Sequence, residues 1–160
     1  MSDRSFEVSL VAIGLKVLAV LLVSLVAGTT FGIWQGYDPA GLSPETFMQM
    51  HQGAVRGLNV LLPSLAAIAI ALTILLAIRA RHDRLSLSIY VAAILLMITA
   101  GLITRFGNQP INAEIMTWSA GAIPAGWETL RDNWWQWHVT RTLITIVAEA
   151  FLVLGTIVDR

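Results

Sequence analysis

Polar residues recur at helical spacing along two segments that are otherwise strongly apolar. One segment carries Gln52, Arg56, Asn59 and Pro63; the other carries His138, Thr142, Thr145 and Glu149, with Arg141 three residues after His138. The i, i+4, i+7, i+11 spacing places each set on one face of a helix. Lipid cannot satisfy polar groups, so such faces turn inward in a membrane bundle. We therefore expect a polar, cation-rich cavity at one end of a helical bundle.

His138 is the predicted centre of chemistry in this cavity. It begins the last apolar segment, on the inward face beside Arg141. Neighbouring arginines disfavour the imidazolium form, so the ring stays a base. The same cations stabilise an enolate or phenolate that forms when the base removes a proton. We expect Arg141 to fill this role, with Arg131 or Arg105.

Other residues of the cavity have less specific interpretations. His51, His138 and Glu114 are candidate metal ligands, and His51 with His138 is a candidate haem pair, but the spacing matches no recognised signature. His51 is alternatively an interfacial residue, and Arg131 and Arg141 alternatively bind lipid phosphates. Asn108 caps a turn in a purely structural interpretation, while Asn112 and Glu114 bond loop backbone. We predict no cofactor, although a metal or haem stays open.

Composition indicates an integral membrane protein with a single domain. Of 160 residues, 56% are hydrophobic and only 12% are charged, whereas soluble domains carry about 25% charged residues. The absence of cysteine excludes disulfides and cysteine-based metal or catalytic sites. The net charge of zero gives no support for a nucleic-acid partner. No Ser–His–Asp order, glycine-rich phosphate loop or HExxH motif is present.

Four apolar stretches are long enough to cross a bilayer, which takes about 20 residues per helix. They cover about residues 8–34, 54–78, 85–106 and 139–158. We therefore predict an all-α, antiparallel four-helix membrane bundle over residues 1–160. Arg79, Arg81 and Arg84 in the second link, with Arg4 and Arg160, predict cytoplasmic termini and the cell (inner) membrane. The link 35–52 and the loop 107–137 then face outward, although Arg105, Arg131 and Arg141 weaken this orientation.

The loop 107–137 is the only long connection, and loops of this length usually have structure or function. Pro110 fits the first turn of a short helix, and a second helix is expected from Ala125 into the last span. The loop is rich in tryptophan, which is typical of a membrane-interface belt. Trp118 and Trp127 alternatively line an apolar pocket for a flat ligand. We expect the loop to fold over the outer end of the bundle as a lid.

Two ionisable residues fall deep within the predicted spans. Lys16 is about 12 Å, and Glu149 about 14 Å, from the same predicted face at 1.5 Å per residue. Because buried charges are costly, we expect an ion pair between the first and fourth helices. A proton path is the functional alternative.

The stretch 108–142 resembles the signature of the anthrone-oxygenase-like family of small four-helix membrane proteins. The matching residues are Asn108-Gln109-Pro110-Ile111-Asn112, then Glu114, Trp118, Pro124, Trp127, Arg131, Trp134, His138 and Arg141-Thr142. The resemblance implies that Asn112, Arg131, His138 and Arg141 line the site. Many relatives place an acidic residue directly after the second asparagine, whereas this chain has Ala113 there and Glu114 next.

The resemblance also implies an activity, because fungal members of the family oxidise anthrones to anthraquinones, apparently without an organic cofactor. The expected partners are a hydrophobic aromatic molecule, O₂ and the lipid bilayer, and a homo-oligomer stays open. The expected substrate-binding residues are Arg56, Asn59, Arg105, Asn108, Asn112, Glu114, Trp118 and Trp127. Two other functions remain as alternatives: a non-enzymatic membrane subunit or small-molecule binder, and a metal or haem protein using His51 and His138.

Overall fold

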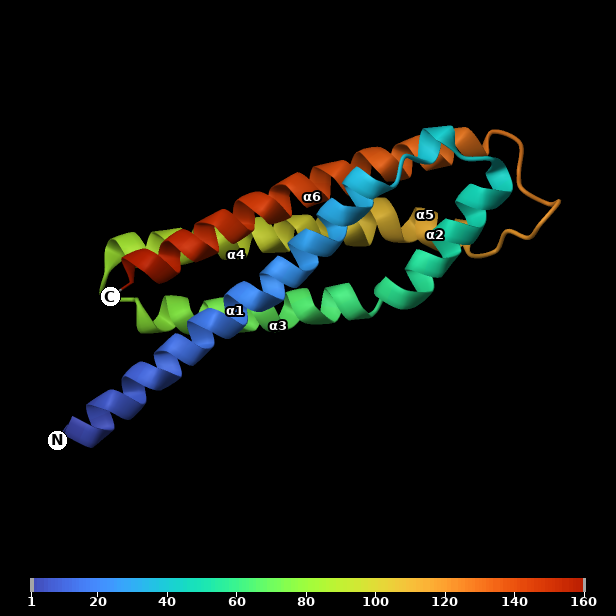
Figure 1. The fold of residues 1–160 in the computed structure, drawn as a ribbon. Coiled ribbons are helices and arrows are strands. Elements are labelled where there is room, and N and C mark those ends of the chain that lie inside the picture. The colour runs from blue at the N-terminus through green and yellow to red at the C-terminus, as the bar shows by residue number, and fades with distance from the viewer. Residues whose placement is uncertain (1, 160) are drawn as a thin grey trace.

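The computed structural model is all-helical, and it describes the backbone of residues 2–159 and the side chains of residues 10–159. Helices α1, α3, α4 and α6 form the bundle, and each contacts two neighbours in the cyclic order α1, α3, α4, α6 (Figure 1). The elements are α1 (Ser2–Gly36), η1 (Pro39–Gly41), α2 (Pro44–Leu58), α3 (Leu61–Arg79), α4 (Arg84–Ile103), η2 (Thr104–Asn108), α5 (Gln109–Ile115) and α6 (Trp127–Val158). The predicted antiparallel four-helix bundle is confirmed.

The bundle presents an apolar surface that suits lipid. Four helical segments are long and apolar enough to cross a membrane: Leu10–Gly41, Pro44–Arg79, Arg84–Ile115 and Trp127–Val158. Large apolar side chains such as Leu21, Leu95 and Leu154 are about half exposed along them. Water-soluble proteins rarely expose such continuous apolar surface. The chain is therefore an integral membrane protein. Its helical segments are longer than the apolar stretches from which the four spans are predicted.

The two ends of the bundle differ in construction. The loop end carries η1, α2, α5 and the 116–126 connection, whereas the turn end carries the α3–α4 turn and Asp159 (Figure 1). At the turn end, Asp83 caps α4 by accepting hydrogen bonds from the amides of Leu85 and Ser86 and from the Ser86 hydroxyl. These hydrogen bonds, the Ser86 hydroxyl foremost, hold the pKa of Asp83 below its ordinary value.

Helix occupies most of the 35–52 segment, which the sequence predicts as a link. Helix α2 begins at Pro44 because the Ser43 hydroxyl accepts a hydrogen bond from the Thr46 amide and proline fits the first helical turn. The helix is interrupted between Leu58 and Leu61, since Pro63 lacks the amide hydrogen that would continue it. The interruption directs α2 away from the axis of α3 toward α5 (Figure 1).

The connection between the third and fourth spans is structured, as predicted. The π-helical turn η2 continues α4 into α5, and it lies just before Pro110, where the proline already removes an α-helical hydrogen bond. Gly107 lets this turn approach α6 closely, because an added Cβ would lie 2.7 Å from Trp137 Cγ. Helix α6 starts at Trp127, close to the predicted start at Ala125.

Small side chains fill the centre of the bundle. The main core contains Ala19, Ala69, Ala77, Ala93 and Ala148, together with larger residues such as Tyr90 and Leu152. Without a hydrophobic force between helices in lipid, such small residues stabilise the bundle by letting backbones pack closely. A second apolar cluster at the loop end joins α2 to α5 and α6 through Phe47, Met48, Ile115, Trp118 and Trp127.

The predicted Lys16–Glu149 pair is wrong. Lys16 Nζ lies 3.0 Å from Asp159 Oδ2, and Tyr90 donates a hydrogen bond of 3.2 Å to the same oxygen. Glu149 instead accepts a hydrogen bond from the Ser24 hydroxyl. The estimate of depth failed because α1 starts at Ser2 and projects beyond the end of α6, which brings Lys16 level with the last turn of α6 (Figure 1). The side chain of Arg4 and all of Arg160, which contribute to the predicted orientation, lie outside the described residues.

Candidate functional site

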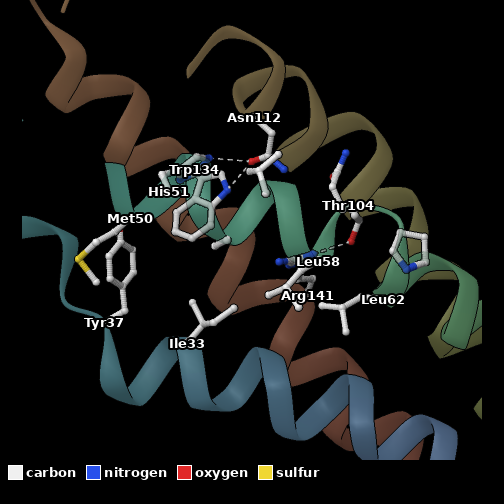
Figure 2. A pocket seen from close by; sticks show the side chains of 14 residues that line it. Ile33, Tyr37, Met50, His51, Leu58, Leu62, Thr104, Asn112, Trp134 and Arg141 are labelled. Atoms are coloured by element: carbon white, nitrogen blue, oxygen red, sulfur yellow. Dashed lines mark hydrogen bonds between the residues drawn. The ribbon is translucent and has the colours of Figure 1, made fainter. Parts of the chain in front are cut away.

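A cavity of about 210 Å³ lies between α1, α2, α3, η2, α5 and α6 at the loop end (Figure 2). We call it the first cavity. Apolar side chains, including Ile33, Leu58 and Leu62, make up most of its wall. Its polar groups come from α2, η2, α5 and α6 and from the segments that follow α1 and α2: Tyr37, His51, Asn59, Thr104, Asn112, Trp134 and Arg141. An apolar cavity with a few convergent polar groups is the usual form of a small-molecule site.

His51, Asn112 and Trp134 form a hydrogen-bonded group on one wall of the first cavity (Figure 2). The Trp134 indole N–H donates to Asn112 Oδ1 at 2.9 Å, and His51 Nε2 lies 3.1 Å from the same oxygen. An indole N–H is only a donor, so the atom of Asn112 that it contacts must be the oxygen. His51 Nε2 therefore also donates, because a carbonyl oxygen has no proton to give.

This arrangement fixes the tautomer of His51. With its proton on Nε2, the neutral ring keeps its lone pair on Nδ1. Within the described residues, Nδ1 has no hydrogen-bond partner. His51 is only 2% exposed and lines the first cavity. The geometry thus supplies one imidazole with an uncommitted basic nitrogen.

His138 lies in a different environment and does not line the first cavity. It is fully buried, and its Nε2 donates to the carbonyl oxygen of Thr30 at 3.0 Å. Its Nδ1 accepts a hydrogen bond of 3.0 Å from Arg141 Nη2. Because a carbonyl only accepts and a guanidinium only donates, both ring nitrogens are occupied. His138 therefore acts in this structure as a fixed acceptor that orients Arg141.

Arg141 is the cation of the first cavity, and no carboxylate among the described side chains forms an ion pair with it. Nη1 donates to the Thr104 hydroxyl at 3.3 Å (Figure 2), while Nε is buried and has no hydrogen-bond partner among the described residues. The ion pairs found within residues 10–159 are Lys16–Asp159 and Arg131–Asp132. An unpaired cation in a membrane span is costly and is a functional candidate by default. The arrangement favours a ligand that brings a negatively charged or strongly polar oxygen.

Aromatic rings hold both histidines in place. Trp134 packs against both, with ring centroids 4.7 Å from His51 and 5.0 Å from His138. Trp135 also stacks on His138, with 15° between the ring planes. Tyr37 packs edge-on against Trp134 at 6.2 Å. These contacts limit rotation of the imidazoles, so the hydrogen bonds described above keep their directions.

A metal or haem held by His51 and His138 does not fit these contacts. Both nitrogens of His138 are bonded to protein groups, and the Trp134 ring packs against each of the two imidazoles. Among the residues that the structure describes, no three histidine, aspartate or glutamate side chains form a metal-binding group. This donor set offers His51 Nδ1 as its one uncommitted imidazole nitrogen.

The structure brings together some of the predicted site residues and separates others. His51, Asn59, Asn112 and Arg141 line the first cavity, and Arg105 lines a second cavity beside it. Asn108 is buried outside both cavities and donates to the carbonyl oxygen of Trp134 at 3.1 Å instead of capping a turn.

Five other predicted residues lie away from both cavities. Arg56 and Glu114 are exposed, and Trp118 and Trp127 belong to the apolar cluster against α2. Arg131 pairs with Asp132 at 2.8 Å and lies over the Trp127 ring. These five therefore hold or surround the loop end and do not contact a ligand in the first cavity.

Some residues of the first cavity were not predicted. The tryptophans of the 107–137 loop are expected in an interface belt, but Trp134 precedes His138 by four residues, so it lies on the same face of the helix, and it lines the cavity. Thr104 and Tyr37 gave no usable signal, because a single threonine in an apolar span and a tyrosine in a link are common.

Comparison with known proteins gives one match. The family model described as anthrone oxygenase matches residues 51–151, which include His51, Asn112, Trp134, His138 and Arg141. Neither the curated proteins nor the solved structures gave a match to the chain.

Proposed function

The chain belongs to the anthrone oxygenase family, and we propose that it oxidises an enolisable aromatic substrate with O₂ in the first cavity. The observation that carries this proposal is the pairing of an uncommitted imidazole nitrogen with an unneutralised arginine. His51 and Arg141 line the same cavity, and the rest of its wall is largely apolar. The site therefore offers a base, a cation for a developing oxyanion and room for a hydrophobic ring system.

The first step is removal of a proton from the methylene carbon that lies opposite the ketone in the central ring of an anthrone and is conjugated with it through the aromatic rings. His51 Nδ1 accepts this proton, and the negative charge moves to the ketone oxygen as an enolate. Arg141 stabilises the enolate through its guanidinium, which the structure already aims by bonds to Thr104 and His138. Preorganised donors aimed at developing charge are commonly the largest contribution to catalysis.

Oxygen then reacts with the electron-rich carbanion form of the enolate. Two electrons pass to O₂ as the new C–O bond forms, and protonation by the His51 imidazolium gives a hydroperoxide. Loss of the remaining C–H proton and cleavage of the O–O bond give the second ketone and water. The balance is one substrate and one O₂ to one quinone and one H₂O, with no other oxidant.

This proposal gives the two histidines different roles from those expected from sequence. His138 was predicted as the base, but both of its nitrogens are bonded and it is fully buried. We therefore propose His51 as the base and His138 as a positioning residue for Arg141. Asn112 holds the reactive tautomer of His51 through the bond to Nε2.

The test is oxygen consumption by the purified protein with anthrone in detergent, measured with an electrode after subtraction of spontaneous oxidation. One anthraquinone is expected per O₂ consumed. His51→Ala should lower kcat by about 10²–10⁴-fold, the usual range for a general base. His82→Ala is the matched control, because His82 is exposed in the α3–α4 turn.

Arg141→Lys should also lower kcat, since lysine keeps the charge but loses the planar donor fork. Arg84→Lys at the exposed start of α4 is the matched control. If the wild-type protein does not accelerate anthrone oxidation but binds anthrone, a binding function replaces the enzymatic one. If His51→Ala keeps full activity while His138→Ala loses it, the assignment of the base is wrong.

A further inference from the structure

A second cavity of about 290 Å³ lies deeper in the bundle, between α1, α3, α4 and α6. It shares four wall residues with the first cavity: Leu62, Pro63, Thr104 and Arg141. The two cavities therefore meet at Arg141, whose guanidinium faces this shared wall through its contact with Thr104. The oxidation chemistry described above uses only the first cavity and leaves the second one unexplained.

Polarity changes along the second cavity. Thr30, Arg105, Gln109 and Arg141 line it toward the loop end, whereas Val23, Ile70 and Met97 line it toward the middle of the bundle. Along α1, Thr30 and Val23 are seven residues apart, which is about 10 Å of helix. The cavity thus has a polar end at Arg141 and an apolar end roughly two helical turns away.

Small residues keep the second cavity open. Ala66, Ala67, Ala100 and Gly101 lie on its wall, at positions where a leucine or valine would reduce the space. Close packing is the rule in protein interiors, and unfilled apolar space loses contacts on every side. A chain-like apolar group entering from the first cavity would restore these contacts.

We propose that the ligand of this protein is an amphiphile: an acidic aromatic ring in the first cavity, carrying an apolar tail that enters the second cavity past Arg141. The inference rests on the proposed function for the identity of the ring. Arg141 contacts the ring oxygen at the junction of the two cavities, and the tail follows the decreasing polarity toward Val23 and Met97. The substrate class is therefore an alkyl-substituted phenolic or anthrone-like compound dissolved in the membrane.

The experiment measures binding of 2-alkylphenols from methyl to heptyl by calorimetry in detergent, because a tail next to the hydroxyl can pass Arg141 while the oxygen contacts it. A buried methylene should raise affinity about fourfold, although partition into micelles offsets part of this gain. Because this partition is the same for every variant, the difference in slope between variants reports the cavity alone.

Gly101→Leu adds a side chain on the wall of the second cavity, at a position that is itself exposed on the surface of the bundle. A Cβ at Gly101 has no heavy atom within 4 Å, so the substitution meets open space. Gly28→Leu is the matched control, since a Cβ there also meets open space and Gly28 is exposed outside both cavities. Ala67→Leu on the same wall is the second test variant, used if Gly101→Leu does not fold.

We expect the gain in affinity with tail length to be several-fold smaller per methylene in Gly101→Leu than in the wild type, and unchanged in Gly28→Leu. Affinity for 2-methylphenol should be the same in all three proteins. Equal slopes in Gly101→Leu and the wild type, or no phenol binding at all, would overturn the proposal. Tail-dependent binding without oxygen consumption from anthrone would leave the amphiphile inference standing and remove the oxidase function.

Discussion

Replacing Asn112 by leucine tests the hydrogen-bonded group that fixes the His51 tautomer. Asn112 Oδ1 accepts from both the Trp134 indole and His51 Nε2. Leucine is similar in size but accepts nothing, so two largely buried donors lose their partner. A stranded donor costs about 1–3 kcal/mol. Hydrogen bonds between membrane helices average only about 0.6 kcal/mol, so we take the lower end of this range, about 1 kcal/mol for each donor. Two stranded donors then lower the free energy of unfolding by about 2 kcal/mol.

The loss is measured by equilibrium unfolding in mixed micelles of detergent and denaturing surfactant. Asn133→Leu is the control, because Asn133 is exposed on α6 one residue before Trp134. Trp134→Phe removes one donor, so the double variant should lose less than the sum of the two single variants, by about 1 kcal/mol. An Asn112→Leu variant as stable as Asn133→Leu would refute the hydrogen-bonded group, and strict additivity would show that Asn112 and Trp134 act independently.

Three further predictions concern the rest of the bundle. A reporter that is active only in the cytoplasm should be active when fused after Arg160; activity only of a periplasmic reporter would reverse the orientation. Lys16→Met should destabilise the protein by more than the roughly 1 kcal/mol of a surface pair, because the Lys16–Asp159 pair is only about one-fifth exposed and the change leaves the Asp159 carboxylate without its cation; adding Asp159→Asn should recover part of the loss, and equal stability of the single and double variants would show that the two residues do not interact. Deleting Phe106, which is 73% exposed in the π-helical turn, should rotate α5 by roughly 100° and abolish activity by moving Asn112; a fully active deletion variant would show that the turn has no role.

The fold was predictable because its signals are local and strong. Each span contains enough apolar residues to cross a bilayer, and lipid requires those residues to be helical. The start of α5 was also predictable from a local signal, because Pro110 fits the first turn of a helix. Helix α2 was missed because Ser43 and Pro44 begin it within a polar segment that lacks a long apolar run.

The residues of the site could be predicted only in part, because which side chains meet depends on how far each helix is shifted along its axis relative to its neighbours. Of the residues that the periodicity turned inward, Asn59 and Pro63 line the first cavity together with Arg141, whereas Arg56 of the same set is exposed. The periodicity could not give the stagger of α1 against α6, so Lys16 was paired with the wrong carboxylate. Nor could it distinguish two histidines that share a tryptophan neighbour but differ in hydrogen-bond partners.

The π-helical turn explains why spacing in the sequence does not show which residues of α4 and α5 meet Arg141 and His51. Up to Ile103, α4 follows the α-helical period, so the residues facing α6 can be counted from sequence. The wide turn Thr104–Asn108 changes that count by placing Thr104 against Arg141 and carrying Asn112 to His51 of α2. A straight helix would lose one or the other of these contacts. The same turn therefore aims the cation through Thr104 and fixes the base through Asn112, which couples the two groups that the proposed reaction requires.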